Sequence, residues 1–159
     1  MTFPDNLIAG DFCLYHTPKF TNDIIDIKTA SLVDHIECYI GNGLSLASRN
    51  GIGVNVYDFR LEGLVVVRRP TLVFNRQLVM DWFETVKGAP YGWGDIIAQA
   101  NIVTSLPGYD CSHFCACLAD KGLLGLFADD FPRNKITPRD FLLPVNLGTF
   151  YSSVAINNQ

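Results

Sequence analysis

The part of the sequence best suited to chemistry is the stretch G-Y-D-C-S-H-F-C-A-C-L-A-D-K-G at residues 108–122. Asp110 is a favourable N-cap residue, and the pattern predicts a helix from about Cys111 to Lys121, with Gly122 placed to end it. Cys111 would then lie in the first turn, where unpaired backbone N–H groups and the helix dipole stabilise a negative charge. A thiol in that position is expected to ionise more easily, and the thiolate is the nucleophilic form. Cys111 is therefore a candidate nucleophile; the alternative is a small buried residue at the start of a helix.

A candidate base lies on a predicted strand at residues 33–41, with the sequence V-D-H-I-E-C-Y-I-G. Side chains alternate between the two faces of a strand, so His35 and Glu37 share one face with Tyr39. Polar groups on one face of so apolar a strand need partners or a function, although an ordinary half-exposed face is the alternative. A Cys nucleophile needs a base that takes its proton and later protonates the leaving group. We therefore predict that the fold brings His35 to Cys111.

Hydrogen-bond donors for an oxyanion are a further requirement of such a site. The backbone N–H of Cys111 or Ser112 could serve, because N–H groups in the first turn of a helix lack helical partners. The stretch G-A-P-Y-G-W-G-D at residues 88–95 is a loop broken by Gly and Pro, which would hold Tyr91 and Trp93 rigidly near a site. The Tyr91 hydroxyl is therefore a second candidate donor.

A metal site is the alternative chemistry for the same stretch. Ligand types suited to zinc are present at Cys111, His113, Cys115 and Cys117. On a helix, however, Cys111 and Cys115 share a face, while His113 points to nearly the opposite side. We therefore expect no metal and no cofactor, and we interpret Cys115 and Cys117 as core residues.

Composition indicates one globular domain spanning residues 1–159. The chain has 159 residues, of which 48% are apolar and 12% aromatic, which is enough for a full hydrophobic core. Twelve Lys and Arg against sixteen Asp and Glu give a formal net charge of −4. Because the basic residues form no stripe, we expect no nucleic-acid partner.

The sequence also bears on membranes and on the compartment. No apolar run approaches the roughly 18 residues of a membrane span. The N-terminus, M-T-F-P-D-N-L-I-A-G-D, has neither a basic region nor a long apolar stretch, so we predict no secretory signal. Five cysteines are an odd number in a chain too large to need disulfides, which favours free thiols in a reducing compartment. These features predict a cytoplasmic location.

The remaining pattern predicts an α+β fold. Short apolar runs bounded by turn residues predict strands at residues 10–16, 33–41, 44–48, 54–59 and 63–69. For the tail S-S-V-A-I-N-N-Q the alternatives are a last edge strand and a frayed end. The turn Gly41-Asn42-Gly43 predicts a tight hairpin, and the unbroken apolar run of 63–69 favours a central strand. Helices are predicted at 21–32, 75–87 and 95–104, a short helix and loop at 123–135, and a final helical turn at 136–143 capped by Thr137. Asn75 is expected to cap the helix at 75–87, whose apolar stripe would consist of Leu78, Val79, Trp82, Phe83 and Val86. His16 ends the first strand and is expected to be a surface or hydrogen-bonded residue.

Two stretches of the chain resemble the NlpC-type papain-like cysteine peptidases in their circularly permuted form. G-A-P-Y-G-W-G-D…Y-D-C-S-H-F at 88–114 is similar to the family's Pro-Tyr-x-Trp-Gly-Gly…Asp-Cys-Ser-Gly-Phe pattern. D-H-I-E-C-Y-I-G-N-G at 34–43 is similar to the family's strand and turn around its histidine. The histidine strand precedes the cysteine helix here, as in permuted members and in the lecithin:retinol acyltransferase-like enzymes. The resemblance covers most of residues 10–143.

The resemblance implies a papain-like fold, in which a central antiparallel sheet packs against the helix that carries the nucleophile. It implies Cys111 as the nucleophile, His35 as the base and Tyr91 as the tyrosine beside the nucleophile. The third polar residue of the family would stand near Ala47, and alanine cannot orient an imidazole. We therefore nominate Glu37, which shares the face of His35. His113 stands where the peptidases commonly have Gly, as in the acyltransferase-like branch, but the second His and the membrane anchor of that branch are missing.

Three functions follow from this resemblance. The leading interpretation is a cysteine hydrolase that cleaves amide bonds, in peptidoglycan stem peptides or a similar peptide, through an acyl-enzyme. The second is a thiol acyltransferase or lipase acting on lipid esters or amides. The third is a non-catalytic module within a phage particle or secretion assembly. Because cell-wall substrates lie outside the cytoplasm, the first requires release by lysis, by a phage tail or by a secretion machine.

Overall fold

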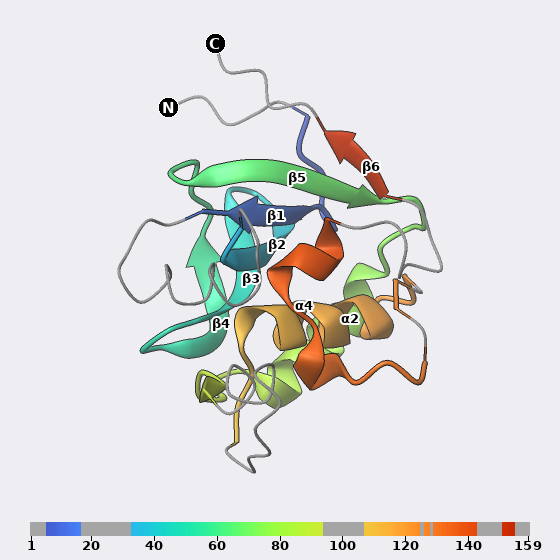
Figure 1. Cartoon of the computed structure of the whole chain (residues 1–159). Helices are drawn as coiled ribbons and strands as arrows, with labels where there is room; N and C mark the ends of the chain where they lie inside the picture. Colours follow the sequence, from blue (N-terminus) through green and yellow to red (C-terminus); the bar gives the residue numbers. More distant parts are fainter. Residues whose placement is uncertain are drawn as a thin grey trace.

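An antiparallel sheet organises the described part of the chain (Figure 1). The computed structural model describes residues 6–16, 33–93, 107–124, 126–127, 129–142 and, for the backbone, 151–154. Within these residues six strands lie in the order β4-β3-β2-β1-β5-β6. Their bounds are Phe12–Tyr15 (β1), His35–Gly41 (β2), Leu44–Arg49 (β3), Gly53–Asp58 (β4), Leu64–Pro70 (β5) and Tyr151–Val154 (β6). The predicted helices at 21–32 and 95–104 lie outside the described residues.

The strand predictions are confirmed to within a few residues. β2 and β3 form the expected hairpin, and both central residues of its turn, Asn42 and Gly43, have positive φ angles of 54° and 70°. The predicted tail strand is the edge strand β6, which pairs with β5. β5 has a neighbour on each side but is less buried than its apolar run suggested: Val67 is fully buried, whereas Val65 is 49% exposed. The apolar run therefore indicated correctly that β5 is not an edge strand, but it overestimated how deeply β5 is buried.

Helix α4, Cys111–Lys121, has the bounds that the sequence predicts. The side chain of its N-cap, Asp110, accepts a hydrogen bond of 2.8 Å from the backbone N–H of His113. The helix ends at Gly122 as expected, although the left-handed residue after it is Leu123, with φ of 59°. α4 packs against β2 and β3, and Figure 1 shows it on the same side of the sheet as α2. The structure is therefore an α+β fold in which an antiparallel sheet packs against the helix that carries Cys111.

Helix α2, Arg76–Val86, was also predicted, with Asn75 as its cap. Val79 and Phe83 of the expected apolar stripe are fully buried, whereas Leu78 is 42% exposed and does not belong to the core. In the described residues after α4 the chain forms two short 3₁₀ turns, Arg133–Lys135 and Pro138–Phe141. The second is the predicted final turn, capped by Thr137. No helix among the described residues is long and apolar enough to cross a membrane.

The two faces of the sheet bury different clusters. The face under α4 contributes Ile36 and Cys38 of β2 to the main core, where they pack with residues of both helices. The opposite face buries a smaller cluster that includes Tyr15 of β1 and Tyr39 of β2. Successive residues of β2 therefore enter different clusters, as the alternation of a strand requires. This division decides which predicted site residues can meet.

The loop at residues 88–91 is held between two glycines, one at the start of β4 and one shortly before α4. Gly53 opens β4, and a Cβ built on it would collide with the carbonyl oxygen of Ala89 and lie 3.1 Å from Cα of Pro90. Gly108, just before α4, approaches the carbonyl of Pro90 in the same way. Backbone hydrogen bonds join the loop to both sides, from Val54 N to Ala89 O and from Tyr109 N to Pro90 O. The clamp holds the chain that leads into α4.

Replacing Gly53 by alanine should therefore destabilise the fold much more than the same change at Gly51. Both glycines have positive φ angles, 89° and 83°, but no atom lies within 4 Å of a Cβ built at Gly51. We expect Gly51→Ala to lower the free energy of unfolding by about 1–2 kcal/mol through backbone strain alone. Gly53→Ala adds the collision and should cost about 3 kcal/mol or more. Urea unfolding followed by tryptophan fluorescence measures both, and equal losses would contradict the clamp.

Candidate active site

Cys111 lies at the first position of α4, against the start of β2. Its Sγ is 3.9 Å from the main-chain oxygen of Asp34 and 3.8 Å from Oγ of Ser112. One turn further along the helix, Sγ of Cys115 lies 3.7 Å from the main-chain oxygen of Ile36. The exposed fraction of Cys111 is 3%. The sequence thus placed the thiol correctly at a helix N-terminus, and packing against β2 buries it there.

The expectation that this thiol ionises easily is wrong for the described conformation. Burial raises the pKa of Cys111 well above its ordinary value, and repulsion from the Asp110 carboxylate raises it further. The Asp34 carboxylate acts in the same direction. Two carboxylates and the loss of solvent therefore outweigh the favourable position at the helix N-terminus, and Cys111 is held as a neutral thiol.

His35 and Glu37 lie together on the other face of the sheet. Nε2 of His35 is 2.9 Å from Oε1 of Glu37, and the His35 ring lies 6.0 Å from the ring of Tyr15 in the cluster away from α4. Among the described residues no hydrogen bond joins His35 to Cys111. The predicted common face of His35 and Glu37 is thus confirmed, but the structure does not bring that face to the thiol. The role of His35 as the base of Cys111 stays a prediction from the sequence.

Glu37 is a fully buried carboxylate with cationic and hydroxyl partners. Oγ of Ser45 donates a hydrogen bond of 2.6 Å to it, and Arg49 donates two, from Nε at 2.8 Å and from Nη2 at 3.0 Å. Nε of Arg60 lies 3.8 Å away. Burial alone would raise the pKa of Glu37, but its bonds to His35 and Ser45 and the charge of Arg49 lower it to about 2. Glu37 is therefore ionised, and it holds the imidazole of His35 in place.

The two residues predicted to assist the oxyanion have different surroundings. Ser112 is buried, and its hydroxyl oxygen lies 3.8 Å from the sulfur of Cys111. Tyr91 is half-buried and forms a backbone bridge to Tyr109, and its ring lies 5.5 Å from that of Trp93. Backbone hydrogen bonds hold the loop before Tyr91, but no hydrogen bond joins Tyr91 to Cys111 in the described part of the chain.

Ala47, which stands where the resemblance would place a third polar residue, offers no polar side chain. Ala47 is buried on β3 and pairs with Asn55 of β4. Its neighbour Ser48 faces the opposite way, toward α4, and donates a hydrogen bond of 2.6 Å to the main-chain oxygen of Tyr109. Ser48 therefore fixes the residue before the Asp110 cap and does not contact His35.

Sequence reasoning missed a second histidine–carboxylate pair, which lies beside the thiol. Nδ1 of His16 is 3.8 Å from Oδ2 of Asp34, whose side chain is fully buried. Asp34 is also the residue whose main-chain oxygen contacts Sγ of Cys111. The available signal was the alternation of the first strand, in which His16 follows the buried Phe12 and Leu14 at a period of two. Without knowing which face α4 covers, that alternation had no functional meaning.

The candidate zinc ligands do not form a cluster. Cys111, His113, Cys115 and Cys117 all lie on helix α4, and Cys115 packs into the main core. Among the residues that the structure describes, no group of three His, Cys, Asp or Glu side chains could hold a metal ion. All five cysteines are free thiols.

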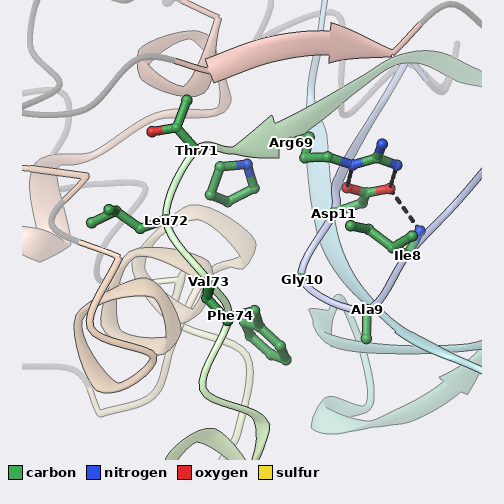
Figure 2. A pocket seen from close by; sticks show the side chains of 10 residues that line it. Ile8, Ala9, Gly10, Asp11, Arg69, Thr71, Leu72, Val73 and Phe74 are labelled. Atoms are coloured by element: carbon green, nitrogen blue, oxygen red, sulfur yellow. Dashed lines mark hydrogen bonds and ion pairs between the residues drawn. The ribbon is translucent and has the colours of Figure 1, made fainter.

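A cavity of about 290 Å³ lies away from the thiol, at the beginning of β1 (Figure 2). Its lining includes the buried Asp11, which accepts two hydrogen bonds of 2.7 Å from Nε and Nη2 of Arg69. Apolar residues also line it, among them Leu72 and the 90% exposed Val73. Cys111 contacts the residue that precedes β2, which lies beside the opposite end of β1. The cavity is therefore separate from the candidate active site.

Comparison with known proteins adds no assignment. No model of a protein family matches the chain. No curated protein matches it either. The function is therefore argued from the residues and their geometry.

Stability should depend on acid titration of Glu37. A carboxyl group with its pKa lowered from an ordinary 4.5 to about 2 stabilises the fold fully above pH 4.5 and loses that contribution as the pH falls through about 2. We expect the loss to amount to about 3 kcal/mol in the free energy of unfolding, and to be missing in Glu37→Gln. Urea unfolding from neutral to low pH measures it. The matched control is Glu62→Gln, at an exposed position; a control that behaves like Glu37→Gln would refute the assignment.

Proposed function

We propose that this protein is a papain-like cysteine hydrolase that cleaves amide bonds, with Cys111 as the nucleophile. The observation that carries the proposal is the contact of 3.9 Å between Sγ of Cys111, at the N-terminus of α4, and the main chain of Asp34, the residue directly before His35. A cysteine at a helix start against a strand that bears histidine is the arrangement expected of this class. The resemblance to NlpC-type enzymes supports peptidoglycan stem peptides, or a similar peptide, as the substrate.

The chemistry follows from these groups. A histidine takes the proton of the Cys111 thiol, and the thiolate attacks the amide carbonyl carbon. Backbone N–H groups in the first turn of α4, such as that of Ser112, donate to the oxyanion. The amine leaves with a proton returned by the histidine, and a water molecule then hydrolyses the thioester and regenerates the thiol.

Reaction requires a change from the described conformation. Cys111 is buried, and its raised pKa keeps the thiol neutral. The proposal therefore assigns deprotonation to the substrate-bound state, in which a histidine reaches Sγ and accepts the proton as the carbonyl is attacked. Catalysis of this kind does not require a resting thiolate, because proton transfer and attack are coupled.

A non-catalytic papain-like module is the second candidate, and the burial of Cys111 favours it. In that case the thiol packs α4 against β2, and His35 serves to hold the buried Glu37. Such a module would fit a structural role in a phage particle or secretion assembly. Activity distinguishes the two candidates directly.

Replacing Cys111 should abolish hydrolysis, while replacing Cys117 should not. Both residues lie on α4, but Cys117 is half-buried and outside the proposed reaction. We expect Cys111→Ala to lower the rate of amine release from cell-wall peptides by about 10⁴-fold or more, because the acyl-enzyme cannot form. Cys117→Ala should stay close to the wild type. Mass spectrometry should find an acyl group on Cys111 during turnover.

Short-chain esters and lipid amides in the same assay test the acyltransferase or lipase alternative. Faster turnover of these substrates than of peptides would replace the amidase proposal. No turnover of either class by a correctly folded wild-type protein, with Cys111→Ala equally stable, would favour the non-catalytic module.

A further inference from the structure

Asp34 lies next to both the candidate nucleophile and His16, a histidine to which the sequence analysis gave no catalytic role. Its main-chain oxygen lies 3.9 Å from Sγ of Cys111. Its carboxylate lies 3.8 Å from Nδ1 of His16, and the Asp34 side chain is fully buried. Asp34 therefore links the thiol of Cys111, through its main chain, to the imidazole of His16, through its carboxylate.

The sheet register explains why His16 and Asp34 meet. Tyr15 of β1 pairs with His35 of β2, and the backbone N–H of Asp34 donates a hydrogen bond of 2.9 Å to the oxygen of Tyr15. His16 and Asp34 are the next residues outward on the two antiparallel strands, so they lie opposite each other. The pairing places the imidazole beside the residue that contacts Cys111.

Alternation places His16 and His35 differently. Phe12 and Leu14 of β1 pack into the core under α4, and His16 follows them at the period of a strand. His35 is instead bonded to Glu37 on the opposite face. His35 would have to leave this buried carboxylate to reach the thiol, whereas His16 already adjoins a residue in contact with it.

The charges around Cys111 call for a cation. Asp110 and Asp34 both disfavour its thiolate. An imidazolium at His16 would offset Asp34 directly, because their side chains are in ion-pair range. The His16 side chain is 42% exposed, whereas the His35 side chain is 13% exposed.

We propose that His16, rather than His35, is the catalytic base of Cys111, and that Asp34 is the positioning residue that orients His16. The substrate in this proposal is that of the proposed function, but the experiment below measures the reactivity of Cys111 without any substrate. With Nδ1 of His16 turned to Asp34, Nε2 is the atom that takes the Sγ proton. The thiolate then bonds to the carbonyl carbon, the C–N bond breaks, and Nε2 returns the proton to the departing amine. In the second half, Nε2 takes a proton from water as the hydroxide attacks the thioester, and then restores it to Sγ.

A complete histidine scan tests the proposal, because the chain has only three histidines. The rate of Cys111 alkylation by iodoacetamide is measured by mass spectrometry, from about pH 5 to about pH 9, in the wild type and in His16→Gln, His35→Gln and His113→Gln. We expect His16→Gln to slow alkylation of Cys111 near neutral pH by about 10-fold or more. The other two variants should stay within about threefold of the wild type. Cys117 in the same digest serves as the internal control, and its rate should not change.

The opposite pattern overturns the proposal. Loss in His35→Gln with a normal rate in His16→Gln would assign the base to His35, and no loss in either would exclude both. Circular dichroism and urea unfolding confirm that each variant is folded. This readout needs no substrate, so it decides between the histidines even if the protein hydrolyses nothing. If hydrolysis is found, its kcat/KM should fall by about 100-fold or more in His16→Gln.

Asp34→Asn tests the positioning role, in the wild type and in the His16→Gln background. If Asp34 affected Cys111 only by repulsion, its replacement would speed alkylation in both. We expect instead a loss of about threefold or more when His16 is present and no loss when His16 is absent, because the effect passes through the imidazole. Equal or faster alkylation in both backgrounds would show that Asp34 does not act through His16.

Discussion

The contact between the start of helix α4 and the start of strand β2 is the interaction on which the rest of the structure depends. It sets the sulfur of Cys111 against the main-chain oxygen of Asp34, just before β2, and the sulfur of Cys115 against the main-chain oxygen of Ile36. Three interactions support it: the Asp110 cap at the helix start, the hydrogen bond from Ser48 to Tyr109, and the glycine clamp around residues 88–91. The last two come from distant parts of the chain and fix the residues that lead into the helix.

The two faces of β2 show how similar burial can have opposite electrostatic results. Glu37 and Cys111 are both removed from water, and burial alone disfavours the charged form of each. Glu37 has Arg49 within hydrogen-bond distance and stays ionised. Cys111 has the carboxylate of Asp110 nearby and stays neutral. The difference lies in the sign of the neighbouring charge, which a period of two along a strand does not reveal.

This limit explains how far sequence reasoning reached. Local chemistry predicted α4 to the residue, because an Asp cap and a following Gly are interactions within a few positions of the chain. It also predicted that His35 and Glu37 share a face, which follows from strand geometry. It could not predict which face of β2 the helix would cover, because that choice depends on packing of the whole core. The partners of His16 were missed for the same reason, since they come from a neighbouring strand.

The burial of Leu78 and Cys111 makes the same point from the core. Periodicity assigned Leu78 to an apolar stripe, but in the fold this residue is 42% exposed to solvent. Helix-dipole reasoning favoured a thiolate at Cys111, but the dipole is a small effect next to desolvation and a capping carboxylate. A helix capped by Asp therefore makes a poor thiolate site unless a cation is added. The only histidine–carboxylate ion pair among the described residues that includes a residue in contact with Sγ of Cys111 is that of His16 with Asp34, whose main-chain oxygen lies 3.9 Å from the sulfur.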